Sequence, residues 1–328
     1  MASAILTPHA REPFGGGPGQ PAGGNRPPAA LPQPGERGPA AAVSGVFLTD
    51  WRRGGPGSWL VSARWPAAHG FYGAAHGLPD PLLLIETVRQ AGIFLSHVAH
   101  GVPLDHPLTW RRVRCDLRPR ALPAAGTPAD IQLEVTDREV VRRRKRLAGV
   151  EQEFRIRYDG EEVAVAALAY SCHSPAGYRR LRGAYGDIAL ANARRLPPPG
   201  PVAPHLVGRE RAGDVVLAPA DRPDRWQLRV DTAHPVLFDH PVDHVPGMLM
   251  VEAVRQAARA AVSGPSLPVA LDCAFERYAE LDAPCWVRAR AGAAAAGDGR
   301  REVAVGAEQH GKRVLEARVA SVPVGPGG

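Results

Sequence analysis

Two long apolar segments stand out in the pattern of hydrophobic and polar positions along the chain. The first includes "DPLLLIETVRQAG" at 80–92, and the second includes "PGMLMVEAVRQAA" at 246–258. From Leu82 to about Val98 the apolar residues go all the way round a helical cylinder, which is typical of a buried helix. Pro81 and Gly247 are suited to begin the two helices, and Asp80 is suited to cap the first. We therefore predict two buried helices.

After each apolar segment the pattern changes to short runs in which apolar and polar residues alternate. Such runs, separated by DG- or GK-type turns, are typical of antiparallel strands and hairpins. They lie at 129–140, 153–160 and 161–173 in the first half, and at 269–281, 285–293, 301–309 and 312–322 in the second. Each half is then one long helix followed by a meander of strands. This predicts an α+β fold in which the helix lies against an antiparallel sheet.

The two helical segments share a polar triplet. Both contain the pattern E-x-x-R-Q, and the copies align without a gap: Glu86, Arg89 and Gln90 in the first, Glu252, Arg255 and Gln256 in the second. We infer a duplicated domain. Gly/Pro-rich stretches then divide the chain into a disordered leader at 1–42, an N-terminal domain at 43–190, a Pro-rich linker at 191–204 and a C-terminal domain at 205–323.

Composition and charge limit the class of partner. The chain is 45% hydrophobic, its pI is about 9.7 and its formal charge is +7, which favours an acidic or phosphorylated partner. None of the four cysteines forms a CxxC pair, which indicates reduced thiols rather than a zinc or redox motif. Because no apolar run reaches roughly 18–20 residues and no export signal is present, we expect a cytoplasmic protein that binds no membrane.

The polar triplets are the candidate chemistry, and two interpretations stay open. A Glu at i and an Arg at i+3 touch on one helical face, so each triplet could be a buried structural ion pair. Alternatively, a glutamate in an apolar wall acts as a base, and the arginine holds a phosphate or an oxyanion. The amino end of the second helix, at Gly247, offers backbone N–H groups for the same oxyanion.

These segments resemble the central-helix motif of hotdog-fold acyl-thioester enzymes such as the β-hydroxyacyl-carrier-protein dehydratases. The duplicated pattern, with "HPVDHVPGMLMVEAVRQAAR" at 240–259 and "FERYAELDAPCWV" at 275–287, resembles the A-factor biosynthesis (AfsA-like) family over about 43–322. The resemblance implies a tandem hotdog, in which each helix is wrapped by a bent antiparallel sheet and the halves pair. It also implies an actinobacterial acyltransferase of γ-butyrolactone signal synthesis, with neither cofactor nor metal.

The implied reaction moves a β-ketoacyl group from acyl carrier protein, or from CoA, to the hydroxyl of dihydroxyacetone phosphate. In this scheme Glu86 or Glu252 deprotonates the hydroxyl, and Arg255 binds phosphate or oxyanion. The remaining substrate-binding candidates are Arg89, Gln90, Gln256, His240, His244 and Gly247, and an apolar groove between helix and sheet holds the acyl chain. The internal duplication supplies the pair of domains, so the protein is expected to be a monomer or a homodimer.

Several alternatives remain beside this interpretation. The dehydratase loop carries a histidine eight residues before the proline that leads into the central helix. Eight residues before the corresponding Pro246, this chain has Phe238, so dehydration by that mechanism is not expected. Asp239, His240, Asp243 and His244 are possible metal ligands. The basic run "RRRKR" at 142–146 suits nucleic acid less well than a solvated hairpin, so no nucleic-acid partner is expected. A non-catalytic thioester- or lactone-binding module and a hotdog thioesterase are the rival functions.

Overall fold

A computed structural model describes residues 5–6, 45–74, 76–294 and 299–324. The described strands form one antiparallel sheet in the order β2-β3-β5-β6-β7-β4-β10-β13-β12-β11-β9-β8, with β1 beside β4. In the first half the strands are β1 Ile5–Leu6, β2 Leu48–Arg53, β3 Ser58–Trp65, β4 Leu108–Leu117, β5 Ala129–Arg143, β6 Arg146–Tyr158 and β7 Glu161–Cys172. In the second half they are β8 Leu217–Pro219, β9 Arg225–Leu228, β10 Ser266–Phe275, β11 Cys285–Ala294, β12 Arg301–Gln309 and β13 Lys312–Pro323.

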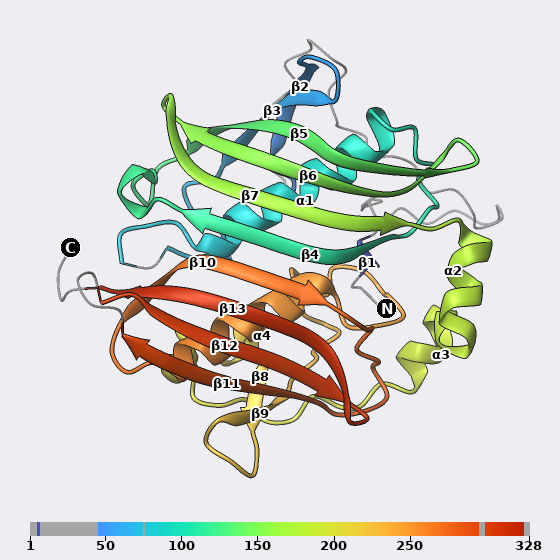
Figure 1. Ribbon diagram of the computed structural model, residues 1–328. Coiled ribbons are helices and arrows are strands. Elements are labelled where there is room, and N and C mark those ends of the chain that lie inside the picture. Colours follow the sequence, from blue (N-terminus) through green and yellow to red (C-terminus); the bar gives the residue numbers. More distant parts are fainter. Residues whose placement is uncertain (1–4, 7–44, 75, 295–298, 325–328) are drawn as a thin grey trace, which may run out of the picture.

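The strand order shows the duplication. Apart from β1, each half contributes six consecutive strands with the same internal connections, and the halves meet where β4 pairs with β10. This seam pairs Cys115 with Leu271 and Val113 with Cys273, so the sheet runs without a break from one half into the other. Figure 1 shows α1 and α4 on the same face of this bent sheet, α1 behind the strands of the first half and α4 behind those of the second. The α+β class and the duplicated arrangement predicted from the sequence are therefore confirmed.

The two long helices begin where the sequence predicts. Helix α1 spans Pro81–Val98, and helix α4 spans Gly247–Ala260. The side chain of Asp80 caps α1 by accepting a hydrogen bond from the Leu82 N–H at 2.9 Å. Most of each helix is buried, because the strands of its own half cover one side and further segments of the chain cover the rest. A Cβ added at Gly92 would lie 2.7 Å from Leu168 Cδ2, so a larger residue here would require the buried Leu168 side chain to shift.

The segments between the two halves are partly helical. The chain leaves β7 through α2 at Pro175–Arg182 and α3 at Ile188–Ala193. Single 3₁₀ turns follow at Gly183–Gly186, Pro204–Val207 and Ala212–Asp214, and another lies within the first half at Pro119–Ala121. The predicted linker at 191–204 therefore begins inside α3, continues without regular secondary structure and ends at the first residue of a 3₁₀ turn. The predicted leader lies outside the described residues, except that Ile5 and Leu6 pair with β4.

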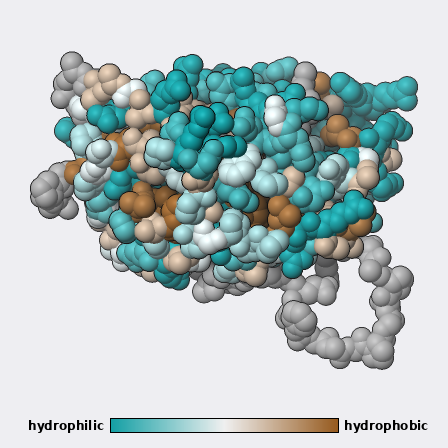
Figure 2. Space-filling view, turned by 90° about the horizontal axis from the view of Figure 1, so that it is seen from below, coloured by the Kyte–Doolittle hydropathy of each residue, from teal (hydrophilic) through white to brown (hydrophobic). Residues whose placement is uncertain are grey.

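The face of the molecule seen from below is mainly hydrophilic (Figure 2). Figure 2 shows one face of the molecule, on which apolar residues form only small, separate patches. The basic run at 142–146 is the exposed tip of the β5–β6 hairpin, where Arg144 and Lys145 adopt positive φ values of 48° and 68°. None of the helices in the described part of the chain is long and apolar enough to cross a membrane.

Candidate active site

The first triplet forms a buried ion pair on α1. Arg89 donates to Glu86 through Nε and Nη2, both at 2.6 Å, in the bidentate geometry that suits a guanidinium and a carboxylate. Gln90 Nε2 also donates to Glu86 Oε1 at 2.9 Å. Burial alone lowers the pKa of Arg89, but the carboxylates of Glu86 and Asp239 raise it, so the guanidinium stays charged. Asp239 belongs to the second half, so the charge of this triplet is influenced by both halves.

The second triplet repeats this geometry on α4 and adds a further cation. Arg255 donates to Glu252 Oε2 at 2.8 Å and to Oε1 at 2.7 Å, and Gln256 Nε2 donates to Oε1 at 2.5 Å. Arg209, which precedes β8, donates its Nε–H to the same Oε1 at 2.8 Å. Glu252 is 0% exposed, so its carboxylate is surrounded by protein donors.

Each glutamine of the triplets fastens its helix to the first segment of its own half. Gln90 accepts from the Phe47 N–H at 2.9 Å and donates to the Gly45 carbonyl at 2.5 Å. Gln256 accepts from the Val216 N–H at 3.0 Å and donates to the Asp214 carbonyl at 2.8 Å. Side-chain amides that pair with a backbone N–H and C=O at once act as braces. These contacts favour a structural role for the glutamines over the predicted contact with substrate.

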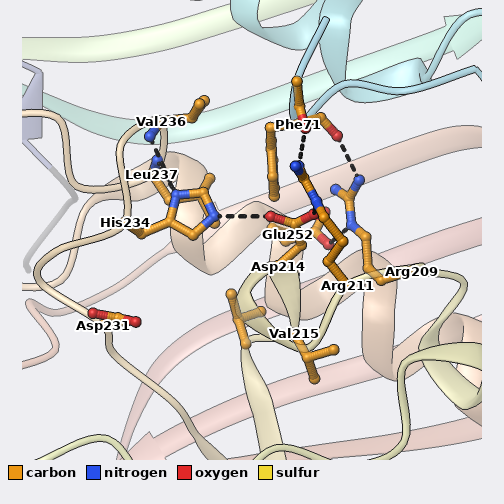
Figure 3. A network of polar contacts seen from close by, with 12 residues as sticks. Phe71, Arg209, Arg211, Asp214, Val215, Asp231, His234, Val236, Leu237 and Glu252 are labelled. Atoms are coloured by element: carbon orange, nitrogen blue, oxygen red, sulfur yellow. Dashed lines mark hydrogen bonds and ion pairs between the residues drawn. The ribbon is translucent and has the colours of Figure 1, made fainter.

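Arg209 joins the two halves (Figure 3). Its guanidinium donates from Nη1 to the Phe71 carbonyl at 2.7 Å, lies 3.4 Å from Asp80 Oδ2, and stacks 4.1 Å from the Phe71 ring centroid. Its neighbour Arg211 donates to the Gly70 carbonyl and, at 2.9 Å, to Asp214. The arginines therefore hold the loop at 69–72 against the second half.

The surroundings of Glu252 argue against a role as a base. Burial raises its pKa, but Arg209 and Arg255 outweigh burial and lower the pKa from 4.5 to about 2. General bases work best when their pKa lies near the operating pH. Both carboxylate oxygens also already accept hydrogen bonds from arginine. This geometry favours Glu252 as the residue that positions two arginines, rather than the predicted proton acceptor.

A pair of histidines repeats between the halves and was not recognised from the sequence as part of the site. His69 Nδ1 accepts from the N–H groups of Phe71 and Tyr72, both at 3.1 Å, and His234 Nδ1 accepts from Val236 and Leu237 at 3.2 and 3.0 Å (Figure 3). Because Nδ1 is an acceptor, Nε2 carries the proton of the neutral ring. Burial lowers the pKa of both imidazoles, which favours this neutral form.

The loop before α4 places its two predicted histidines in different surroundings. His240 lies at the surface with its Nδ1 2.8 Å from Asp239 Oδ1, whereas His244 is 1% exposed with its Nδ1 2.6 Å from Asp243 Oδ1. Each imidazole thus pairs with the aspartate before it. Among the described residues no group of three or more His, Cys, Asp or Glu side chains has metal-site geometry.

The amino ends of the two helices differ. The N–H groups at the start of α1 face the carboxylate of Asp80, whereas α4 begins after Pro246 without a side-chain cap. The buried Gly247 is the first residue of α4. Since orphan N–H groups at a helix start stabilise negative charge, α4 is better suited than α1 to hold a developing oxyanion.

A narrow cavity lies where the two halves meet beside Arg255. Its volume is about 20 Å³, and its lining includes Leu82, Ile85, Cys115, Leu117 and Leu271 together with Arg255. A space of this size is comparable to one water molecule. The apolar lining agrees with an acyl-binding role, but an acyl chain fits only if the walls move apart.

Comparison with known proteins identifies the family. The family model "A-factor biosynthesis hotdog domain" matches the chain twice, at residues 40–174 and 190–325. The chain belongs to this family. The fold is a tandem hotdog, and the two matches correspond to the two halves of the sheet.

Two relatives and one solved structure illustrate the similarity. A protein of Streptomyces virginiae named 2-oxo-3-(phosphooxy)propyl 3-oxoalkanoate synthase is 44% identical over 283 residues, covering 86% of this chain and 94% of the relative. A protein of the same name from Streptomyces coelicolor is 37% identical, covering 79% and 82%. The crystal structure of an oleoyl thioesterase from Lactobacillus plantarum matches with a TM-score of 0.52 at 14% identity, covering 81% and 97%. That structural likeness shows the fold alone.

Proposed function

We propose that this protein transfers a 3-oxoacyl group from a thioester to the free hydroxyl of dihydroxyacetone phosphate, as a step in γ-butyrolactone synthesis. The observation that carries this proposal is the 44% identity to a synthase along nearly the whole of both chains. The name of that relative describes a 3-oxoalkanoate ester of a phosphorylated, keto-bearing three-carbon unit. Such an ester is the product expected from dihydroxyacetone phosphate and a 3-oxoacyl donor.

The start of α4 supports acyl transfer, because it has no side-chain cap, whereas the start of α1 is capped by Asp80. The N–H groups at the start of α4 suit the oxyanion that forms when the hydroxyl attacks the thioester carbonyl. Arg89 is paired with Glu86, and its pKa is also raised by Asp239 in the loop that leads into this helix. Arginine is suited to the phosphate of the acceptor, because its planar donors match phosphate oxygens.

The donor is proposed to be acyl carrier protein, with CoA as the other thioester of the same chemistry. The net charge of +7 favours either partner, since both carry acidic groups. Steering of this kind acts mainly on the association rate. Raising the ionic strength is therefore expected to raise the apparent KM for the donor more than it changes kcat.

Product analysis tests the proposed function. Purified protein is incubated with a 3-oxoacyl thioester and dihydroxyacetone phosphate, and the products are identified by mass spectrometry. The proposal predicts a phosphorylated ester that requires protein and both substrates. Free 3-oxo acid in equal amounts with and without acceptor would indicate a thioesterase, and bound but unreacted thioester would indicate a binding module.

A further inference from the structure

A second buried polar cluster lies between α2 and the loop before α4. Its centre is the pair of Asp243 and His244, which are 3% and 1% exposed. The 2.6 Å contact between His244 Nδ1 and Asp243 Oδ1 fixes the tautomer of the ring. With its Nδ1 proton directed at a carboxylate, the imidazole has its basic lone pair on Nε2.

Two further side chains hold the aspartate of this pair, and a third binds one of them. The Tyr178 hydroxyl donates to Asp243 at 2.8 Å, and Arg182 Nε donates to Asp243 Oδ2 at 2.9 Å. Arg182 is itself bound by the two oxygens of Glu280 at 2.7 and 2.6 Å. Burial raises the pKa of Asp243, but the contacts with His244 and Arg182 outweigh burial and keep this pKa well below its usual range.

The imidazole is also fixed from its other side. The ring of Tyr278 meets the His244 ring edge-on with centroids 4.9 Å apart, and the Arg182 guanidinium stacks on Tyr278 at 4.0 Å. A base held by an aspartate, which is in turn held by further donors, is the arrangement by which enzymes activate a hydroxyl nucleophile.

We propose that His244 is the general base of the acyl transfer, that Asp243 orients it, and that Arg182 and Tyr178 position Asp243. The inference rests on the proposed function and assigns a residue for its central step. The acceptor hydroxyl gives its proton to His244 Nε2 as its oxygen forms a bond to the thioester carbonyl carbon. The carbon–sulfur bond then breaks, and the same proton passes to the leaving thiolate, which departs as a thiol.

The place of His244 in the chain agrees with this role. It lies three residues before Gly247, so the base and the uncapped end of α4 lie within about 10 Å of each other along the backbone. Because His244 is buried, proton transfer takes place away from bulk water. This disfavours hydrolysis of the thioester relative to transfer.

The chain contains a matched control for this pair. Asp239 and His240 have the same order and a similar contact of 2.8 Å, but their side chains are 30% and 34% exposed. An Asp-to-Asn change at either place removes one carboxylate next to a histidine. The inference predicts that only the change at Asp243 alters proton transfer.

The test measures log(kcat/KM) for the acceptor against pH in the full-length protein and three variants. His244→Ala is expected to lose about 100- to 10,000-fold in kcat and to lose the acidic limb of the profile. Added imidazole is expected to restore part of that rate. Asp243→Asn is expected to lower kcat strongly with little change in KM, whereas Asp239→Asn retains the acidic limb of the wild-type profile.

The outcomes separate this inference from the proposed function. If the wild-type protein forms no ester, the proposed function fails. If it forms the ester and His244→Ala, folded by circular dichroism, keeps the wild-type pH profile, His244 is not the base. A folded His244→Gln protein with a wild-type profile would overturn the inference in the same way, and it covers the case in which the alanine variant does not fold.

Discussion

The negative charge of Glu252 stabilises the folded protein. The size of this stabilisation follows from the surroundings of the carboxylate. The change Glu252→Gln keeps the shape of the side chain and removes the charge that binds Arg209 and Arg255. The pKa of Glu252 falls from 4.5 to about 2, because the two arginines outweigh burial. At about 1.4 kcal/mol per pKa unit, the ionised carboxylate contributes about 3 kcal/mol near neutral pH.

The sign of the pH dependence follows from the lowered pKa. Since the folded pKa lies below the unfolded one, the contribution is complete above about pH 4.5 and is lost as the pH falls through about 2. About 1.5 kcal/mol is expected to remain at pH 3. Glu252→Gln should lower the free energy of unfolding relative to the wild-type protein, and this difference should be about 2 kcal/mol smaller at pH 3 than at pH 7.

Urea unfolding followed by tryptophan fluorescence measures this difference, since the chain has six tryptophans. Glu316→Gln is the control, because Glu316 is 58% exposed and pairs with Arg313 on the surface. That change is expected to alter the free energy of unfolding by less than about 0.5 kcal/mol at either pH. If Glu252→Gln lowers the free energy of unfolding by the same amount at pH 7 and at pH 3, the reasoning is refuted.

Three further predictions concern packing, braces and thiols. Gly92→Ala should lower the free energy of unfolding by about 1–3 kcal/mol in urea, because the new methyl group meets Leu168. Gln90→Ala and Gln256→Ala should each cost about 1–3 kcal/mol in the same assay, because each leaves a backbone N–H without its acceptor. All four cysteines are free and buried, and burial raises their pKa, so a thiol reagent should label them only on unfolding. Labelling of the native protein within seconds would contradict that prediction.

The fold could be predicted from the sequence because its signals are local and repeated. The apolar run at 82–98, the capping Asp80 and the alternating strands each depend on neighbours in the chain, and the duplicated E-x-x-R-Q pattern shows the pairing of halves. The cytoplasmic location, the absence of metal, nucleic-acid and membrane partners, and the oligomeric state stay predictions. So do the domain boundaries, although the family matches fall on both halves.

The partners of the candidate residues could not be predicted, because they come from distant segments. Arg209 reaches Glu252 from a loop 43 positions away, and Arg182 reaches Asp243 from a helix 61 positions away. Neither arginine belongs to a repeated pattern. His69 and His234 do repeat, at nearly the same distance before each helix, and that repetition was the available signal.

The most direct test of the acyl transfer follows the oxygen atom of the acceptor. Dihydroxyacetone phosphate carrying ¹⁸O in its free hydroxyl is incubated with the protein and a 3-oxoacyl thioester, and the product is analysed by mass spectrometry. The account predicts a phosphorylated ester that keeps the label in the oxygen bridging acyl and triose groups. An ester without the label, or unlabelled free acid as the sole product, would contradict attack of this hydroxyl on the thioester.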